Sequence, residues 1–561
     1  MKFQDFPYAR PNQDEVQAKY EGFVSDFSKA KDFSAQLAVY QAYEDLEKEV
    51  STMGTIAHVR FTINTKDSFY KEECDFYDEW GPVLQEKEQV LAKMLLDSPF
   101  VEEFRQELGD VAIKGMEMSM RSFSPAVVEL KQKENELTTK YQALYASATV
   151  EFDGKTMPLP MLGPYKISPD RSIRKAAFEV EGKFFDDNQE ELDRLYDDLV
   201  KNRTEQAKIL GYPDYVALAY DRRNRNCYDA KAVAEYRKQI LSDIVPLVSR
   251  VKEKQKKRIS VDNLKLYDDP FLFPDGNPTP QGTPEELMAH CRKMYNEMSP
   301  ETAEFIEVMF EKELFDVISR DGKAPGGYCT TITGYGVPFI FSNFNGTSGD
   351  VDVLTHEAGH ALAAYLSQDK KYLCQQHATA DACEVHSMAM EYLTSPWHEL
   401  FFKEDTAKYT LNQAESDLSF LPYGTMVDYF QELVYQNPSW TPAQRNEKWA
   451  ELEKQFRPHL DFDGLPFYGR GAGWQRQLHI YLYPFYYIDY CLASTVALQI
   501  QAMKLQDSKK AWETYLKYTK MSGTKTFLDL VTTAGLQSPM EDGCLKSICD
   551  VISQWWEKLE V

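Results

Sequence analysis

The segment from His356 to His360, with the sequence His-Glu-Ala-Gly-His, carries the residues of this chain that are best suited to catalysis. Helix-forming residues flank it on both sides, which predicts that it lies on a helix. At about 3.6 residues per turn, positions i and i+4 share one face, so the imidazoles of His356 and His360 can reach one zinc ion. Glu357 would then lie beside the open coordination position, as the general base that activates water. The alternative interpretation is a pair of histidines buried in an ordinary helical core.

A zinc site of this kind needs a third protein ligand, and the segment 380–393 offers four candidates. They are Asp381, Glu384, His386 and Glu391. If the segment is helical, Glu384 and Glu391 share a face, whereas His386 points in nearly the opposite direction. Glu384 follows His360 by 24 residues, which leaves room for a turn and a returning helix. This spacing predicts Glu384 as the third ligand and Glu391 as a carboxylate that orients a ligand histidine, with a plain surface carboxylate as the alternative for Glu391.

A second group of polar aromatic residues lies near the C-terminus, where His479 precedes several tyrosines. Tyr483, Tyr487 and Tyr490 recur at i, i+4 and i+7, which predicts one face of a helix. When water attacks a peptide carbonyl an oxyanion forms, and neutral tyrosine and histidine side chains can donate hydrogen bonds to it. The stripe is therefore either a wall of a substrate site or part of an aromatic core.

Helical patterns dominate the segments that must position these residues. Over the first ~150 residues, apolar side chains recur at helical spacing, as at Leu46, Val50 and Ala57, which predicts long packed helices. The stretch 148–164 contains Asp-Gly and three prolines, which predicts a short hairpin followed by extended chain. We take it as the boundary between an N-terminal helical lobe, residues 1–165, and a catalytic region, residues 166–561.

Several helix starts can be predicted within the catalytic region. Ser168 is followed by a proline and an acidic residue, the pattern of an N-cap with proline at the first helical position. Thr283 and Thr441 each begin a capping-box pattern, with an acceptor side chain three residues later. The catalytic region is therefore also expected to be mainly helical.

One region departs from the helical pattern: residues 324–341 are rich in glycine and β-branched side chains. This composition predicts a small hairpin or sheet directly before the histidine motif. An exposed strand edge beside a metal can hold a peptide by main-chain hydrogen bonds. The alternative is a sheet that merely connects neighbouring elements.

The composition of the 561-residue chain excludes several classes of function. Apolar residues make up 43% and charged residues 27%, which are ordinary values for a globular protein. The formal net charge of −25 repels phosphate backbones and anionic lipid surfaces, so neither nucleic acid nor membrane is expected as a partner.

Targeting signals and cysteine usage point to one compartment. No apolar run approaches the ~20 residues of a membrane-spanning helix, and the first residues lack the pattern of a secretory signal. Nine cysteines are scattered along the chain without a CxxC pair. This usage predicts free thiols and a reducing, cytoplasmic setting.

The combination of these motifs resembles one known family. The string HEAGH, the later Glu-Val-His-Ser at 384–387 with Glu391 beyond it, and HIYLYPFYYIDY at 479–490 resemble thimet oligopeptidases and oligoendopeptidase F, and most nearly the bacterial Pz-peptidases. The resemblance implies a mainly α fold, a two-lobed helical shell around a deep central channel, with a small β-sheet near the active site. It also implies one zinc ion per chain and unstructured oligopeptides as substrates.

Roles carry over from the family to the matching positions of this chain. The resemblance implies that zinc is bound by His356, His360 and Glu384, that Glu357 is the base, and that Glu391 supports a ligand. The residues expected to bind the substrate carbonyl and oxyanion are His479, Tyr487 and Tyr490. The residues expected to contact the substrate elsewhere are Gly327, Tyr328, Tyr335, Gly336, Tyr483 and Tyr486.

The expected function is therefore hydrolysis of short peptides by a zinc endopeptidase. One alternative is a zinc carboxypeptidase of related fold, which would differ in what closes the ends of the channel. A second alternative is a peptide-binding scaffold without activity, against which the presence of Glu357 and all three ligands argues. The sequence is compatible with a monomer or a homo-oligomer.

Overall fold

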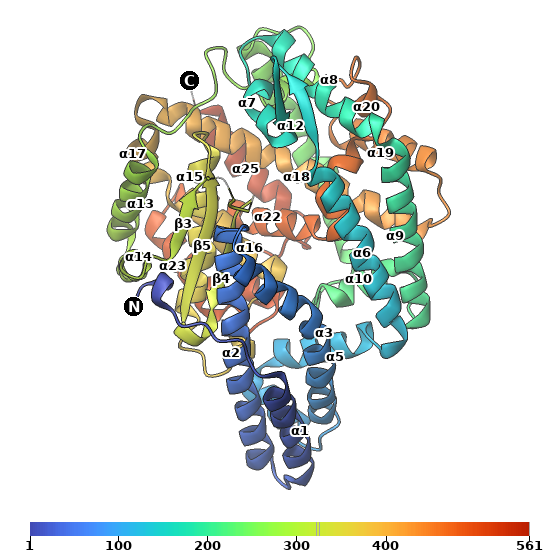
Figure 1. Cartoon of the computed structure of the whole chain (residues 1–561). Helices are drawn as coiled ribbons and strands as arrows, with labels where there is room; N and C mark the ends of the chain where they lie inside the picture. The colour runs from blue at the N-terminus through green and yellow to red at the C-terminus, as the bar shows by residue number, and fades with distance from the viewer. Residues whose placement is uncertain (321, 325, 560–561) are drawn as a thin grey trace. The chain divides into compact units, whose positions relative to one another are not determined.

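The protein is described by a computed structural model that covers residues 1–320, 322–324 and 326–559. Helices dominate it, and the strands form only two small sheets, so the prediction of a mainly α fold is confirmed (Figure 1). The chain divides into two units, each assembled from three separate segments. The first unit comprises residues 1–120, 279–406 and 499–536, and the second comprises residues 121–278, 407–498 and 537–561.

The first unit contains the sheet that precedes the histidine motif. Its helices and strands are α1 Gln13–Lys29, α2 Phe33–Ile63, α3 Ser68–Leu96, α4 Val101–Leu108, α5 Asp110–Ser122, α13 Pro284–Met298, α14 Pro300–Glu311, β3 Phe315–Ile318, β4 Tyr328–Ile332, β5 Val337–Phe344, α15 Gly349–Leu366, α16 Ala380–Leu393, α17 His398–Phe402, α23 Ser508–Met521 and α24 Phe527–Thr533.

The second unit is built on long helices and one hairpin. Its elements are α6 Val128–Ala146, β1 Thr149–Phe152, β2 Lys155–Pro158, α7 Gly163–Lys166, α8 Arg171–Asp187, α9 Gln189–Ile209, α10 Tyr215–Arg222, α11 Ala230–Gln239, α12 Val245–Arg258, α18 Thr406–Gln436, α19 Pro442–Phe456, α20 Pro466–Gly469, α21 Leu478–Leu482, α25 Cys544–Glu557 and α22 Tyr487–Lys504. The residues of α22 from Gln499 onward are assigned to the first unit.

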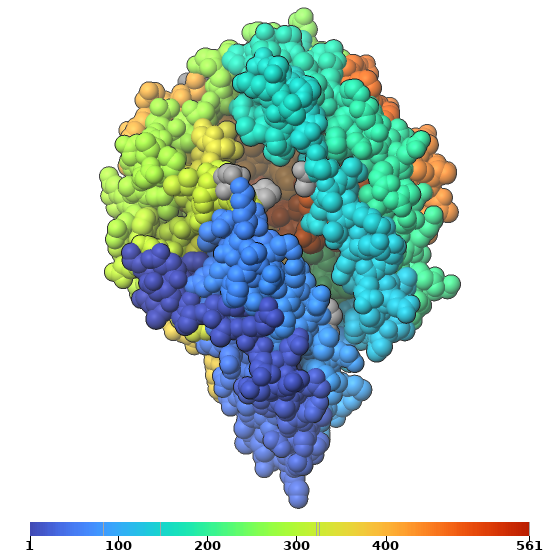
Figure 2. Space-filling view, in the orientation of Figure 1, coloured from blue at the N-terminus to red at the C-terminus, as the bar shows by residue number. Residues whose placement is uncertain are grey.

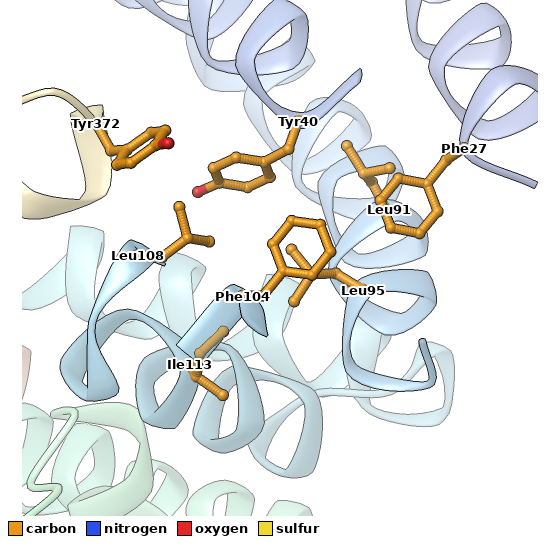
Figure 3. Packing of buried hydrophobic residues seen from close by; sticks show 8 residues of the cluster. All are labelled: Phe27, Tyr40, Leu91, Leu95, Phe104, Leu108, Ile113 and Tyr372. Atoms are coloured by element: carbon orange, nitrogen blue, oxygen red, sulfur yellow. The ribbon is translucent and has the colours of Figure 1, made fainter. Parts of the chain in front are cut away.

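The N-terminal helices pack through two aromatic and aliphatic clusters. One cluster brings together side chains of α1 to α5 and the later loop residue Tyr372 (Figure 3). The other contains Leu46 and Val50, two of the residues whose spacing predicted packed helices, which confirms that prediction. Residues of this segment form a continuous stretch of the surface of the first unit (blue in Figure 2).

The predicted sheet before the histidine motif is present. Its strand order is β3-β5-β4, with β5 parallel to β3 and antiparallel to β4, so β4 is an edge strand. Helix α15 packs against the sheet (Figure 1). Pro325, within the predicted glycine-rich segment, lies outside the described residues. The sheet therefore carries the helix on which the histidines lie.

Several local predictions can be compared directly with the structure. The hairpin is confirmed: β1 and β2 pair antiparallel around Asp153 and Gly154, which both have positive φ. Both capping boxes are also present, at the N-termini of α13 and α19. The predicted N-cap at Ser168 is wrong, because α8 begins at Arg171 and Asp170 caps it by accepting a hydrogen bond from the Ser172 amide. Among the described helices, none is both long and apolar enough to cross a membrane.

Candidate metal centre

Two helices of the first unit, α15 and α16, bring the predicted ligands together. Their backbones approach closely at Gly359, where a Cβ atom would lie 2.7 Å from Ser387 Cα and 2.9 Å from the carbonyl carbon of His386. Since real Cβ atoms do not make such short contacts, only glycine fits at this crossing. The central glycine of the motif therefore sets the separation at which Glu384 can reach the histidines.

The three predicted ligands converge on one point. The Nε2 atom of His356 lies 3.5 Å from Oε2 of Glu384, and the Nε2 atom of His360 lies 3.6 Å from it. A tetrahedral zinc ion with bonds of about 2.0–2.1 Å holds its ligand atoms about 3.3 Å apart. Two imidazoles and one carboxylate at these separations fit zinc, and among the described residues this is the group found with metal-binding geometry.

Glu391 contacts the ring nitrogen of His356 that does not face the other ligands. Its Oε1 atom lies 2.7 Å from Nδ1 of His356, so the carboxylate holds the proton on Nδ1 and leaves Nε2 free for a metal. The placement agrees with the helical periodicity, which put Glu384 and Glu391 on one face of α16. The expected role of Glu391 thus has a direct geometric basis.

The other two candidates for the third ligand are occupied elsewhere. His386 is buried on the far side of α16, where its backbone carbonyl accepts a hydrogen bond from Tyr515. Burial lowers the pKa of His386 to about 3, so its imidazole is neutral. Asp381 is in the first turn of α16, and its carboxylate accepts a hydrogen bond from the Ala382 amide. Neither belongs to the metal-binding group.

The charge of the Glu384 carboxylate makes the site suitable for binding a cation. Although burial acts to raise the pKa of Glu384, its hydrogen bonds with the two histidines hold that pKa well below its usual range. Burial raises the pKa of Glu357, the residue between the two histidines in the motif. The Glu357 charge in turn adds to burial in raising the pKa of the Cys329 thiol on β4. Glu357 therefore lies close to the edge strand.

A cavity of about 730 Å³ lies beside β4 within the first unit. Cys329, Thr330 and Thr331 of the strand line it on one side, and residues of α2, α3 and α5 line it on the others. Three of these are glutamates: Glu44 and Glu47 of α2 and Glu88 of α3. Burial and the neighbouring Glu47 raise the pKa of Glu88 to about 7. No sequence pattern predicts this cavity, because its walls come from segments that are distant along the chain.

The predicted C-terminal cluster lies in the second unit and is only partly helical. The ring of His479 is 4.9 Å from that of Tyr487, 5.7 Å from that of Tyr486 and 6.1 Å from that of Tyr490. The prediction that Tyr483 shares a helical face with Tyr487 is wrong. The chain leaves helix after α21, passes through a left-handed residue at position 485, and re-enters helix at Tyr487, which leaves Tyr483 51% exposed.

Gln477, which is not among the predicted site residues, contacts this cluster. The side-chain amide nitrogen of Gln477 lies 3.3 Å from Nδ1 of His479, and its oxygen accepts a hydrogen bond from the Tyr423 hydroxyl at 2.8 Å. With Gln477 donating to Nδ1, the proton of a neutral His479 is on Nε2. Proximity in the sequence was the only available signal for Gln477.

The glycine-rich segment is packed against the N-terminal part of the chain. The Tyr328 hydroxyl is 2.6 Å from that of Thr62, and the Tyr335 ring stacks on Phe6 with a centroid distance of 3.8 Å. Gly336 has a φ of +60° and ends the turn between β4 and β5, and Gly327 directly precedes β4. Both tyrosines therefore have contacts within the protein, and the expected substrate contacts of this segment stay predictions.

Comparison with known proteins identifies the family to which this architecture belongs. Residues 165–549 match peptidase family M3, and residues 3–123 match the peptidase M3 N-terminal domain. The chain belongs to peptidase family M3. The expected kinship with oligoendopeptidases is thereby confirmed.

Individual members of family M3 resemble this chain along nearly its whole length. A solved structure of Pz peptidase A with an inhibitor is 44% identical, covers 99% of both chains and superposes with a TM-score of 0.94. An oligoendopeptidase F homolog of Lactococcus lactis subsp. lactis is 21% identical over 90% of this chain and 86% of its own. Another oligoendopeptidase F homolog, from Borreliella burgdorferi, is 24% identical over 71% of this chain and 68% of its own. This M3 chain is accordingly a peptidase of the oligopeptidase type.

Proposed function

We propose that this M3 peptidase is a zinc-dependent endopeptidase that hydrolyses short, unstructured peptides. One observation carries the proposal: the Nε2 atoms of His356 and His360 and the Oε2 atom of Glu384 converge at the spacing of a tetrahedral zinc site. One zinc ion per chain would be held there. Glu357 follows the first ligand directly in α15, as a general base at such a site must.

A zinc ion held at this site would polarise the substrate carbonyl and acidify water. Glu357 accepts the proton of the attacking water and delivers it to the departing amine, so that one carboxylate acts as base and then as acid. Glu391 keeps His356 in the tautomer that presents Nε2. The two histidines and Glu384 would thus hold the cation, Glu391 orients one of these histidines, and Glu357 moves the proton.

The edge strand β4 is the proposed support for the substrate backbone. Thr331 of β4 lies opposite Pro338 of β5. Because proline has no backbone N–H, these two residues cannot form both of the backbone hydrogen bonds that a fully hydrogen-bonded pair would have. The main-chain groups of alternate β4 residues are then directed to the open edge, where an extended peptide can pair with them. The cavity beside β4 would accept a side chain of that peptide.

The histidine and tyrosines of the second unit are the proposed donors to the substrate oxygen. His479, held with its proton on Nε2 by Gln477, can donate to a carbonyl oxygen. Tyr487 and Tyr490, whose rings neighbour His479, would donate to the developing oxyanion. The nine cysteines are scattered along the sequence without a CxxC pair, which supports a cytoplasmic location for the enzyme.

An assay with an internally quenched peptide blocked at both ends tests this function. We expect hydrolysis that a chelator abolishes and zinc restores. Glu357→Gln should retain zinc but lose turnover by orders of magnitude, because the amide cannot accept the proton. A Glu357→Gln enzyme with near-normal turnover would refute the assigned base.

The same assay separates the alternatives. Internal cleavage of the doubly blocked peptide indicates an endopeptidase, whereas a product ladder that requires a free C-terminus indicates a carboxypeptidase. Binding without any cleavage in the zinc-loaded protein would instead indicate a peptide-binding scaffold.

A further inference from the structure

A second cavity, entirely within the second unit, is lined by an unusual number of cationic side chains. Its volume is about 380 Å³. The lining residues that bear on its charge are Lys252, Asp269, Glu415, Arg457, His459 and Arg476. In a chain with a net charge of −25, a cavity with three basic side chains and two acidic ones stands out.

Most of these charges are already neutralised by partners. Lys252 lies 2.8 Å from Asp269, and Arg457 lies 3.1 Å from Glu453 and 3.3 Å from Asp269. Glu415 is paired with Arg258, which contacts it at 2.5 Å. The cavity therefore contains ion pairs that account for every charged residue in its lining except one.

The exception is Arg476. Within residues 1–320, 322–324 and 326–559, its guanidinium makes no hydrogen bond and no ion pair, and it lies over the Tyr468 ring at 5.9 Å from the ring centroid. The charges of Glu181 and Glu453 both reach Arg476. Glu181 is itself paired with Lys166, and Glu453 is paired with Arg457. The side chain of Arg476 is half-buried in the cavity wall, and the five N–H donors of its guanidinium are open to a ligand in the cavity.

A neutral donor or acceptor in the same cavity is likewise unused. The Nδ1 atom of His459 is buried and has no hydrogen-bond partner among the described residues. Burial lowers the pKa of this histidine to about 3, so its imidazole is uncharged at neutral pH. Among the described residues that line the cavity, Arg476 is thus an unpaired cation, and His459 offers a neutral ring nitrogen that has no partner.

This cavity shares its walls with the proposed oxyanion-binding cluster. Phe420 and Tyr423 line the cavity, and their rings lie 6.0 Å and 6.1 Å from that of Tyr487. Arg476 directly precedes Gln477, the residue that contacts His479. A peptide whose carbonyl oxygen meets His479 would therefore pass close to the cavity.

We propose that this cavity is a carboxylate-binding subsite for the peptide substrate, with Arg476 as its anchor. The proposal rests on the proposed function of the His479 cluster. The planar guanidinium matches a carboxylate in two parallel hydrogen bonds, and a carboxylate supplies the negative charge that the cavity lacks. The carboxylate is either the C-terminus of the substrate or an acidic side chain near it.

Equilibrium binding tests the subsite without depending on turnover. Peptides of four to ten residues, labelled at the N-terminus, are compared as free acid, as C-terminal amide, and as amide with glutamate at the last position. Affinity is measured by fluorescence anisotropy with zinc-loaded Glu357→Gln protein, and mass spectrometry checks that the peptides stay intact. At the best length we expect the free acid to bind about tenfold or more tightly than the amide.

Substitutions of the anchor provide the specific readout. In the Glu357→Gln background, Arg476→Gln should abolish the difference in affinity between the free acid and the amide. Arg476→Lys should keep part of that difference, because lysine retains the positive charge but cannot form two parallel hydrogen bonds with a carboxylate. Arg470→Gln is the matched control, because Arg470 is already paired with Asp186 at 2.8 Å. That variant should discriminate as the parent does.

The outcomes separate the two carboxylate sources and the two proposals. Recovery of affinity by the glutamate-terminated amide indicates an acidic side chain, and no recovery indicates the C-terminus. Equal affinity of acid and amide at every length, or full discrimination in folded Arg476→Gln, overturns the subsite even if the enzyme cleaves peptides. The free acid and the amide are also compared on protein that keeps Arg476. Equal affinity there contradicts the subsite even if the Arg476 variants fold poorly. Absence of any hydrolysis by the unsubstituted enzyme overturns the proposed function instead.

Discussion

Replacing Gly359 by alanine should damage the metal site although the new methyl group touches no ligand. The added Cβ would lie 2.7 Å from Ser387 Cα and closer still to the His386 carbonyl oxygen. Carbon atoms in contact rest about 3.5 Å or more apart, so α16 must move away from α15 by about 0.8 Å. Glu384 is on the displaced helix, and zinc sites tolerate about 0.2 Å in their bond lengths.

Two opposing effects decide the stability of this variant. Alanine is favoured over glycine within a helix by about 1 kcal/mol. Forcing two packed backbones apart costs about 1–3 kcal/mol or more, since neither backbone is a flexible side-chain end. The packing cost is the larger effect, so we expect Gly359→Ala to unfold at a lower temperature and to bind zinc at least tenfold more weakly.

Competition with a chromogenic chelator measures the zinc affinity. Thermal unfolding in the presence of chelator measures how much stability the metal-free protein loses. Gly22→Ala is the matched control, because Gly22 is within α1 and a Cβ there meets no atom within 4 Å. The control should bind zinc normally and gain slightly in stability. A Gly359→Ala protein with the zinc affinity and unfolding temperature of the parent would refute the argument that this glycine sets the helix separation.

Three further substitutions test other parts of the account. Glu391→Gln should lower zinc affinity about tenfold in the same competition assay, because the amide orients His356 Nδ1 less strongly than the carboxylate at 2.7 Å; an unchanged affinity would contradict this. Tyr487→Phe should lower kcat on the quenched peptide by about 10²-fold or more with little change in KM, if its hydroxyl donates to the oxyanion; retention of the parental kcat excludes that role. Glu88→Gln should alter the pH dependence of stability. Because burial and Glu47 raise the pKa of Glu88 to about 7, the folded protein keeps a proton that the unfolded chain releases above about pH 4.5, so the parent loses up to about 3 kcal/mol of unfolding free energy between pH 4.5 and 7. The Glu88→Gln protein should not lose this unfolding free energy. If the unfolding temperatures of parent and variant change in parallel from pH 4.5 to 8, the raised pKa of Glu88 is contradicted.

The metal centre could be predicted from the sequence because it depends on helical periodicity. Positions 356 and 360 share a face on any α-helix, and positions 384 and 391 share a face on another. Once both segments were correctly predicted as helices, the shared face of each pair followed. The crossing of the two helices was not predictable, since it depends on which side chains meet at Gly359. The division of the chain at residue 165 stays a prediction.

The C-terminal cluster shows where periodicity fails. The tyrosine spacing assumed an unbroken helix, but Pro484 lies in the run and Phe485 adopts a φ of +64°. The rings still gather around His479, because the chain turns back into helix at once. Arg476 carried no sequence signal, since an unpaired arginine can be recognised only when every neighbour in space is known.

Zinc titration of the chelator-treated enzyme tests the metal centre most directly, with bound zinc and peptide hydrolysis measured in the same samples. We predict that activity rises with bound zinc and reaches its limit at one ion per chain, and that Glu384→Ala neither holds zinc with comparable affinity nor regains activity. Hydrolysis that persists without metal, or a Glu384→Ala enzyme that binds zinc and works as the parent does, would contradict the account.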